Sequence, residues 1–202
     1  MPKDLDLTLF KKDAFFSRYP KRKVYNIYGG DPLCFKGIDD LLILLVDADI
    51  KVRLWINGGQ FESVYEGLLP YVSEWVFYVP IPDVNQYNAL VGESGWDTLI
   101  NNLDYFKKIG QVFALNYKVT SSNIIYLPEM YEMAHSYGVK LYLHYDPKQF
   151  FDSESLRYID RFRRVKEVDV YRVRSYGNQS CLGYPGEVIA DWFQVLKNRM
   201  AW

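Results

Sequence analysis

YNIYGGDP, residues 25–32, is the stretch that decides the fold, because it has the pattern of a strand that ends in a tight turn. Its first half is rich in the β-branched and aromatic residues that favour strands. Gly29 and Gly30 can adopt positive φ and Pro32 has a fixed φ, so the backbone can turn sharply and approach a ligand closely. An apolar pattern with helical spacing follows at residues 38–47. The stretch therefore predicts a strand, a turn and a helix in succession.

The same succession of strand and helix repeats along the chain. Strands are predicted at residues 5–10, 23–28, 51–56, 75–79, 112–119, 140–145 and 168–173. Helices are predicted at residues 13–19, 38–47, 61–69, 97–109, 128–138, 152–165 and 186–200. Residues 83–95 are predicted to be a loop without an element of its own. Ser94 and Asp97 are predicted to form a capping box for the helix that Gly110 ends.

Repeated strand–helix units at this spacing predict a parallel sheet in an α/β protein. About six to seven units fit within the 202 residues, and no linker divides them, which predicts one domain spanning residues 1–202. An open doubly wound sheet and a partial or closed (β/α) barrel both fit this order. The strands favour the barrel, because they alternate apolar with polar residues, whereas strands covered by helices on both faces are almost continuously apolar.

The polar faces of the strands are predicted to line the inside of the barrel. This inner set comprises Asn26, Arg53, Asn57, Asn116, Lys118, His144, Asp146, Arg172 and Arg174. Because buried charges need partners, such an interior would hold internal ion pairs, water or a ligand. The set has more cations than anions, which favours an anionic ligand. The alternative is that some of these residues lie at strand ends and face solvent.

Composition argues against several classes of function. The formal net charge of −1 provides no basic field for nucleic acid or an acidic membrane. No apolar run approaches the roughly 18 residues of a membrane span, and residues 1–13 are too charged for a secretory signal, so a cytoplasmic protein is expected. Cys34 and Cys181 are the only cysteines. Two isolated thiols cannot form a four-cysteine zinc site, and no metal site is predicted.

The order of these landmarks resembles the radical SAM superfamily over residues 23–147. The landmarks are a strand ending in GGDP, a strand ending at Asn57-Gly58, a strand ending near Asp83, and the run GWDTLINNLDYFKKIGQVFALNYKVTSSN at residues 95–123. The resemblance implies a radical-SAM-like partial barrel and S-adenosylmethionine as a candidate ligand.

The resemblance also assigns roles to individual residues. Gly29, Gly30, Asp31 and Pro32 match the turn that holds the amino group of S-adenosylmethionine in that family, with Asp31 where Glu is usual. Asn57 and Gly58 match a strand-end turn, Asp83 lies near the strand region that can reach the ribose, and Asn123 matches an Asn after the following strand. The ligand pocket at the carboxyl ends of the strands is expected to contain Asp31, Asn57, Asn116, Lys118, His144 and Arg174.

The sequence departs from the family at the cluster motif. Radical SAM enzymes hold a [4Fe–4S] cluster through three cysteines in a CxxxCxxC loop, and the corresponding residues 10–20, FKKDAFFSRYP, contain none. Two cysteines cannot supply three thiolates, so no iron–sulfur cluster is expected.

Three functions remain open. The first is a binding module for S-adenosylmethionine, for another small anionic or nucleotide-like ligand, or for a protein. The second is a hydrolase or isomerase whose catalytic candidates are His144, Asp146 and Lys118, since catalytic groups gather at the carboxyl ends of barrel strands. The third is an interaction protein without a small ligand.

Overall fold

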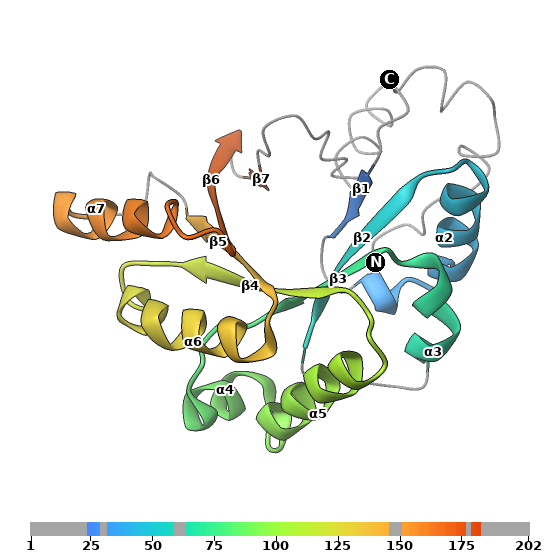
Figure 1. The fold of residues 1–202 in the computed structure, drawn as a ribbon, viewed down its shortest axis with the longest axis horizontal. Coiled ribbons are helices and arrows are strands. Elements are labelled where there is room, and N and C mark those ends of the chain that lie inside the picture. The colour runs from blue at the N-terminus through green and yellow to red at the C-terminus, as the bar shows by residue number, and fades with distance from the viewer. Residues whose placement is uncertain (1–23, 29–31, 59–63, 146–150, 177–178, 183–202) are drawn as a thin grey trace.

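The structure, a computed structural model, describes residues 24–28, 32–58, 64–145, 151–176 and 179–182. Within them, six parallel strands follow one another in sequence order and a seventh pairs antiparallel with the sixth. The strands are β1 Val24–Ile27, β2 Lys51–Asn57, β3 Glu74–Tyr78, β4 Phe113–Val119, β5 Lys140–Tyr145, β6 Val168–Tyr176 and β7 Gln179–Leu182. The sheet curls into a half-barrel, which confirms the predicted partial α/β barrel (Figure 1).

The helices lie around the outside of the curled sheet (Figure 1). The α-helices are α2 Ile38–Asp47, α3 Val64–Leu68, α4 Val84–Val91, α5 Gly95–Lys108, α6 Leu127–Tyr137 and α7 Ser153–Phe162. Three short 3-10 helices, η2 Pro32–Cys34, η3 Leu69–Tyr71 and η4 Ile124–Tyr126, connect them to the strands. None of the helices in these described ranges is long and apolar enough to span a membrane.

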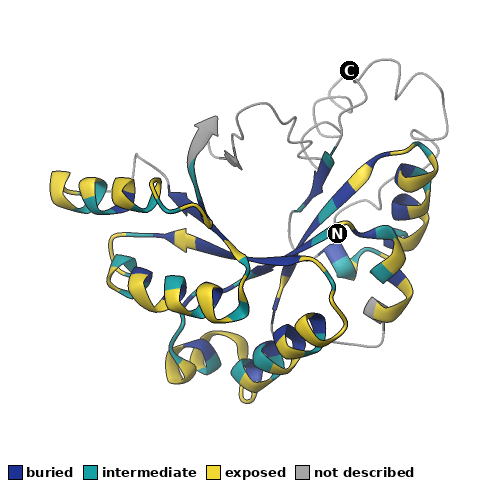
Figure 2. Cartoon of the chain, viewed as in Figure 1, coloured by how far each residue is buried: buried dark blue, intermediate teal, exposed yellow. Residues whose placement is uncertain are grey.

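Two apolar clusters lie on opposite faces of the sheet. The outer face carries the main core, in which strand residues such as Leu54, Phe77 and Leu115 pack with helix residues such as Leu42 and Leu103. The inner face carries a smaller cluster of Trp55, Val76, Ala114 and Tyr142. Figure 2 shows the helices buried on the side that faces the sheet and exposed on the other. The predicted alternation of the strands is therefore confirmed, with the outer face apolar and the inner face mixed.

Several element boundaries follow directly from the sequence. α2 covers residues 38–47 and β5 covers residues 140–145, as predicted. α6 has Pro128 in its first turn, and Gly138 ends it with φ of 69°. Gly110, with φ of 70°, follows the end of α5 and donates its N–H to the Lys107 carbonyl. Pro and Gly act here through their backbone preferences, which do not depend on tertiary contacts.

The predicted loop at residues 83–95 is wrong, because α4 forms within it. The Asp83 carboxylate accepts a 2.9 Å hydrogen bond from the Gln86 N–H and so caps this helix. The Ser94–Asp97 capping box is also wrong. Ser94 adopts a left-handed conformation with φ of 67°, its side chain makes no capping hydrogen bond, and α5 begins at Gly95.

The end of the described chain also differs from expectation. α7 ends at Phe162, three residues before the predicted end, and β6 continues to Tyr176 before pairing with β7. β7 lies between the strand predicted at residues 168–173 and the helix predicted at residues 186–200, where no element was predicted. The elements predicted at residues 5–10, 13–19 and 186–200 lie outside the described residues, and the single domain over residues 1–202 stays a prediction.

Candidate functional site

Polar and aromatic side chains gather on the inner face of the half-barrel, where β1 to β6 lie side by side. We call this group the inner-face cluster. It comprises Asn26, Arg53, Trp55, Glu74, Tyr142, His144 and Tyr171. The inner position of Asn26, Arg53 and His144 was predicted from strand alternation and is confirmed, as is that of Asn116 on β4. The side chains of Arg172 and Arg174, and all of Asp146, lie outside the described residues.

A neutral ion pair forms the polar part of the inner-face cluster. The Arg53 guanidinium contacts the Glu74 carboxylate on the neighbouring strand, and the two side chains are only 14% and 17% exposed. The Asn26 amide oxygen accepts hydrogen bonds from Arg53 Nη1 at 3.4 Å and from Trp55 Nε1 at 3.0 Å. The Tyr142 hydroxyl donates to the second Glu74 oxygen at 2.8 Å. Each of these side chains is therefore hydrogen-bonded or ion-paired to another side chain of the network.

The sequence predicted an excess of cations on the inner face. Arg53 does not add to such an excess, because Glu74 neutralises its charge. Glu74 was missed because it is the first residue of β3, and the sequence pattern placed the start of that strand at Trp75. The charge on Arg53 is thus already compensated within the protein, so it contributes little attraction for an anionic ligand.

Aromatic rings form the rest of the inner-face cluster. The His144 ring lies 5.3 Å from the Trp55 ring and 5.2 Å from the Tyr171 ring, measured between centroids. The Tyr142 ring contacts the Trp55 ring. It also lies beneath the Arg53 guanidinium, whose Cζ atom is 5.2 Å from the Tyr142 ring centroid. Trp55, Tyr142 and His144 are buried and pack mainly on one another, and only the Tyr171 ring of this group is partly exposed.

His144 is kept neutral by burial. Only 2% of the residue is exposed, and burial lowers the pKa of its imidazole to about 3. A general base works best with a pKa near the operating pH, so the environment of His144 is poorly suited to that role. This weakens the catalytic assignment and fits a residue that packs and hydrogen-bonds as a neutral ring.

Asn116 is the strongest indication of a ligand on this face. It is 9% exposed, and its amide oxygen has no hydrogen-bond partner among the described residues. Asn116 lies next to Tyr142 of β5 and Tyr78 of β3 in the strand register. An unpaired buried acceptor costs about 1–3 kcal/mol, so such atoms are usually paired with water or a ligand. The Asn116 oxygen can accept a hydrogen bond from an amino or hydroxyl group.

Four other predicted binding residues lie in or near turns at the carboxyl ends of the strands. Pro32 is buried at the start of η2, and Asn57 is exposed at the end of β2. Gly58 follows Asn57, and a Cβ atom there would lie 2.3 Å from Leu99 Cδ1, so any side chain at this position would have to displace Leu99 of α5. Asp83 caps α4. Gly29, Gly30 and Asp31 lie outside the described residues.

Two further predicted residues lie at the end of β4 and in the turn after it. Lys118 is exposed near the end of β4 and is the register partner of His144 on β5. Both ends of the Asn123 amide are used within its own turn: the oxygen accepts from the Thr120 N–H at 2.7 Å, and the nitrogen donates to the Lys118 carbonyl at 2.9 Å. The role of Asn123 visible here is therefore to close the turn after β4.

No metal centre is visible in the part of the chain that the structure describes, where no three His, Cys, Asp or Glu side chains are grouped for metal binding. Cys34 is exposed in η2, and Cys181 lies on β7. Three thiolates for a [4Fe–4S] cluster do not exist in these 202 residues, so the residues present do not fit that cofactor.

Sequence reasoning missed the aromatic part of the site as well as Glu74. Trp55 and Tyr142 are not among the residues predicted to line the inner face. The signal that could have identified them is their position: each lies two residues from a predicted inner polar residue, Arg53 or His144, and so faces the same way.

Comparison with known proteins identifies relatives by structure only. No family model and no curated protein matches the sequence. SuiB from Streptococcus suis matches with a TM-score of 0.60 and 19% identity, over 76% of this chain and 40% of SuiB. SuiB bound to S-adenosylmethionine gives a TM-score of 0.59, with 19% identity over 76% of this chain and 38% of SuiB. Archaeal TYW1 gives 0.55 with 14% identity, over 84% of this chain and 60% of TYW1.

These neighbours are radical SAM enzymes, so the chain has a radical-SAM-like fold, as the sequence resemblance implied. At such low identity the likeness establishes the fold alone. The chain spans about two fifths of the length of SuiB and about three fifths of that of TYW1.

Proposed function

We propose that this chain binds S-adenosylmethionine, or another ligand with an adenosine group, on the inner face of the half-barrel near the carboxyl ends of β3 to β5. The buried, unpaired amide oxygen of Asn116 is the observation that carries this proposal. The partly exposed ring of Tyr171, which packs on Tyr142 and His144, offers a surface for a planar base on the same face. A structure of SuiB with bound S-adenosylmethionine shares this fold, which supports the choice of ligand.

The proposed role is binding without radical chemistry by this chain itself. Cleavage of the sulfonium in radical SAM enzymes depends on a reduced cluster, and two cysteines cannot hold one. Because Glu74 neutralises Arg53, this pair gives no preference for a strongly anionic ligand, which is compatible with the net positive charge of S-adenosylmethionine.

The alternative function, a hydrolase or isomerase, has weaker support. Burial depresses the pKa of His144, the leading candidate base, and Lys118, its register partner on β4, is exposed to solvent. A peptide or protein ligand remains the second candidate, because SuiB with its bound precursor peptide SuiA has the same fold at a TM-score of 0.56.

Calorimetric titration of the full chain with S-adenosylmethionine tests the proposal. We expect the wild type to bind and Asn116→Leu to bind at least about tenfold more weakly, which corresponds to about 1.4 kcal/mol for a lost hydrogen bond and a blocked site. Asp31→Ala tests the turn assigned by the resemblance. Asn85→Ala, exposed on α4, is the control and should bind as the wild type does.

The same titration after anaerobic treatment with iron and sulfide tests separately whether S-adenosylmethionine binds and whether its binding needs an iron–sulfur cluster. Equal binding before and after treatment supports binding without a cluster, whereas binding that appears only after treatment contradicts it. No heat in either state would contradict the ligand assignment.

A further inference from the structure

Exposed hydrophobic side chains gather where α4 meets η4. Among the described residues, Leu90 and Ile125 are the most exposed of the large hydrophobics, at 68% and 67%. Val84 and Val91 on α4 are also exposed. We call these four residues the α4–η4 patch. Single exposed hydrophobics are ordinary, but four on two adjoining segments suggest a surface used for association.

A hydrogen bond joins the two segments that carry the patch. Gln86 Nε2 on α4 donates to the Tyr126 hydroxyl on η4 at 2.6 Å. Leu90 lies one helical turn beyond Gln86 and therefore on the same side of α4, while Ile125 precedes Tyr126 in the chain. α4 and η4 are thus neighbours in space although about 40 positions separate them in sequence.

α4 is held in place independently of its exposed residues. Tyr87 is almost completely buried, and its ring makes an edge contact with Trp96, with centroids 5.6 Å apart. The Asn88 side-chain oxygen accepts a 2.8 Å hydrogen bond from the Trp96 N–H. The Asp83 cap fixes the other end of the helix. Leu90 therefore lies on a preformed helix whose attachment is made by other residues, among them Val91, which packs on Gly95 of α5.

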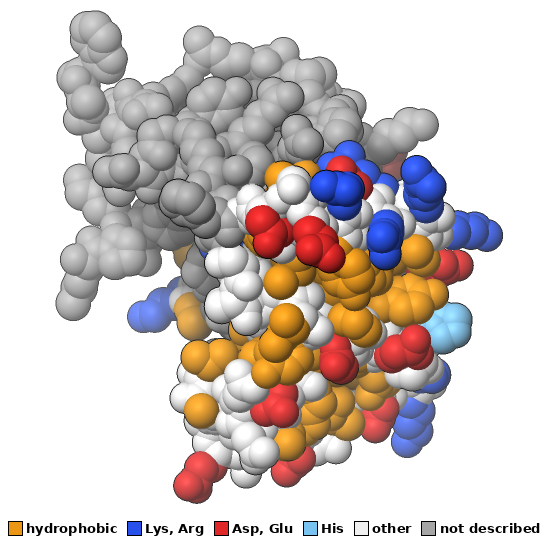
Figure 3. All heavy atoms as spheres, turned by 90° about the vertical axis from the view of Figure 1, so that its left-hand side faces the viewer, with side chains coloured by type: hydrophobic (Ala, Val, Ile, Leu, Met, Phe, Trp, Pro, Cys, Tyr) orange, Lys and Arg blue, Asp and Glu red, His pale blue; other side chains and the backbone are white. Residues whose placement is uncertain are grey.

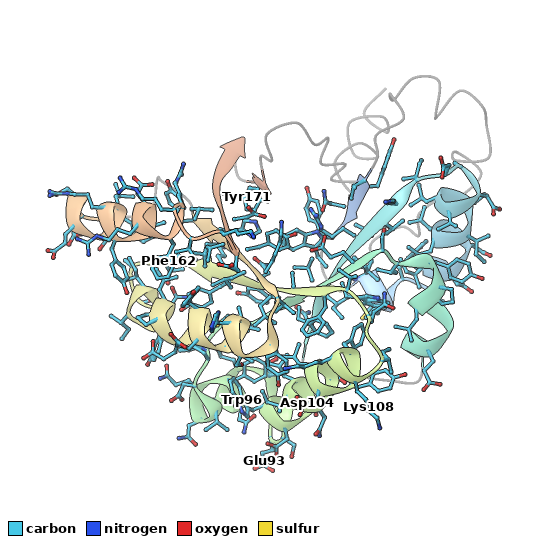
Figure 4. The ribbon with its side chains drawn as sticks, viewed as in Figure 1. Glu93, Trp96, Asp104, Lys108, Phe162 and Tyr171 are labelled. Atoms are coloured by element: carbon cyan, nitrogen blue, oxygen red, sulfur yellow. The ribbon has the colours of Figure 1, made fainter. Side chains whose placement is uncertain are left out.

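The charge next to the patch is mainly acidic. Asp83 caps α4, Glu93 and Asp97 lie between α4 and the first turn of α5, and Glu129 lies in the first turn of α6 after η4, whereas Lys118 is the basic residue at the turn before η4. Figure 3 shows hydrophobic and acidic side chains intermixed on this side of the molecule, with Lys and Arg gathered mainly above them. Glu93 follows Gly92, the C-cap of α4, and points away from the molecule beyond Trp96 (Figure 4).

We propose that the α4–η4 patch is a docking site for a basic, amphipathic segment of a partner protein. The apolar side of that segment would cover Leu90 and Ile125, and its Lys or Arg side chains would face Glu93 and Glu129. This charge complementarity selects the partner, because an acidic segment of equal hydrophobicity would be repelled. The site lies on the outer, helix-covered side of the half-barrel, so it does not depend on the proposed ligand of the inner face.

Fluorescence anisotropy with a labelled helical peptide of Leu and Lys tests the proposal on the full chain. We expect saturable binding, weakened at least about tenfold by the double substitution Leu90→Gln and Ile125→Gln, because hydrophobic anchors dominate such contacts. Substitution of Glu93 and Glu129 by Gln should weaken binding at low salt and reduce its salt dependence. A peptide of Leu and Glu with the same spacing should not bind.

The matched control is Ile43→Gln with Val46→Gln, which removes two exposed hydrophobics from α2. This variant should bind as the wild type does. The proposal is overturned if the peptide binds the patch variant and the wild type equally, or if the Leu and Glu peptide binds as well. Sedimentation velocity tests the alternative occupant: a wild-type dimer that the Leu90 and Ile125 substitutions abolish, without peptide binding, would assign the patch to a second copy of the chain.

Discussion

The Tyr142 hydroxyl on β5 donates a 2.8 Å hydrogen bond to Glu74 on β3, although β4 lies between these two strands. On β4, the small side chain of Ala114 belongs to the apolar cluster of the inner face that also contains the Tyr142 ring. Because the sheet is curved, side chains of β3 and β5 approach one another on its concave inner face. The hydrogen bond therefore links β3 to β5 across β4 on the inner face. It also holds the Tyr142 ring beneath the guanidinium of the Arg53–Glu74 pair.

Removal of Glu74 should destabilise the fold. Glu74→Ala leaves the Arg53 charge without its carboxylate and the Tyr142 hydroxyl without its acceptor, so we expect a loss of about 2–3 kcal/mol, below the full cost for a completely buried pair. Urea denaturation measures this change. The matched control is Asp169→Ala, which breaks the exposed Lys140–Asp169 pair and should cost no more than about 0.5 kcal/mol. Similar losses in both variants would contradict a special role for Glu74.

A larger residue at position 114 should disrupt the same contact. Ala114 is fully buried among Trp55, Val76 and Tyr142, so the added atoms of Ala114→Leu have no free space. We expect a loss of about 1–3 kcal/mol in the free energy of unfolding. Double substitution with Tyr142→Phe provides the check. If the leucine acts by displacing the Tyr142 hydroxyl from Glu74, the two losses should be less than additive, whereas full additivity would show that the leucine acts elsewhere.

Much of the fold could be predicted because it depends on local patterns. Apolar residues at helical spacing located α2, and alternation along the strands placed Asn26, Arg53, Asn116 and His144 on the inner face. α4 could not be predicted in the same way. It has only eight residues, its single buried residue is Tyr87, and its position depends on Trp96 beyond the next turn. Short helices of this kind are stabilised by tertiary contacts that a local pattern does not reveal.

The site was less predictable than the fold, because it depends on pairs of residues from different strands. Sequence alternation shows that Arg53 faces inward but not that Glu74 neutralises it. Nor does it show that any side chain in place of Gly58 would have to displace Leu99, or that Asp83 caps a helix. For both residues the structure supplies a structural role alongside the one that the family resemblance suggested.

The stability of the protein should depend on the protonation of His144. Its pKa is about 3 in the folded chain and about 6.5 in the unfolded chain, so between these values the unfolded state binds more protons. Stability is therefore fully present above about pH 6.5 and falls as the pH decreases toward 3, with a loss of about 2 kcal/mol at pH 5. Urea denaturation at several pH values measures this slope.

The chain has two histidines, which provides the control for that slope. His144→Gln should remove the His144 contribution to the pH dependence, whatever its effect on absolute stability. His135 is exposed on α6, and His135→Gln should keep the wild-type slope. An unchanged slope in His144→Gln would show that other groups titrate in this range and that the imidazole is not held neutral by burial.

Substitution of Gly58 should separate packing from ligand binding at the end of β2. A Cβ atom at this position would lie 2.3 Å from Leu99 Cδ1, so Gly58→Ala forces Leu99 or α5 to move, and we expect a loss of about 1–3 kcal/mol. Gly67→Ala is the matched control: no atom lies within 4 Å of its added Cβ, and it lies in α3, where alanine should be neutral or stabilise by up to about 1 kcal/mol. Thermal unfolding compares the two variants. Adding S-adenosylmethionine should raise the melting temperature of Gly58→Ala as much as that of the wild type if Gly58 serves packing alone, because its carbonyl already accepts a buried hydrogen bond from Asn102. A ligand-induced shift that is lost only in Gly58→Ala would instead assign this turn to the binding site.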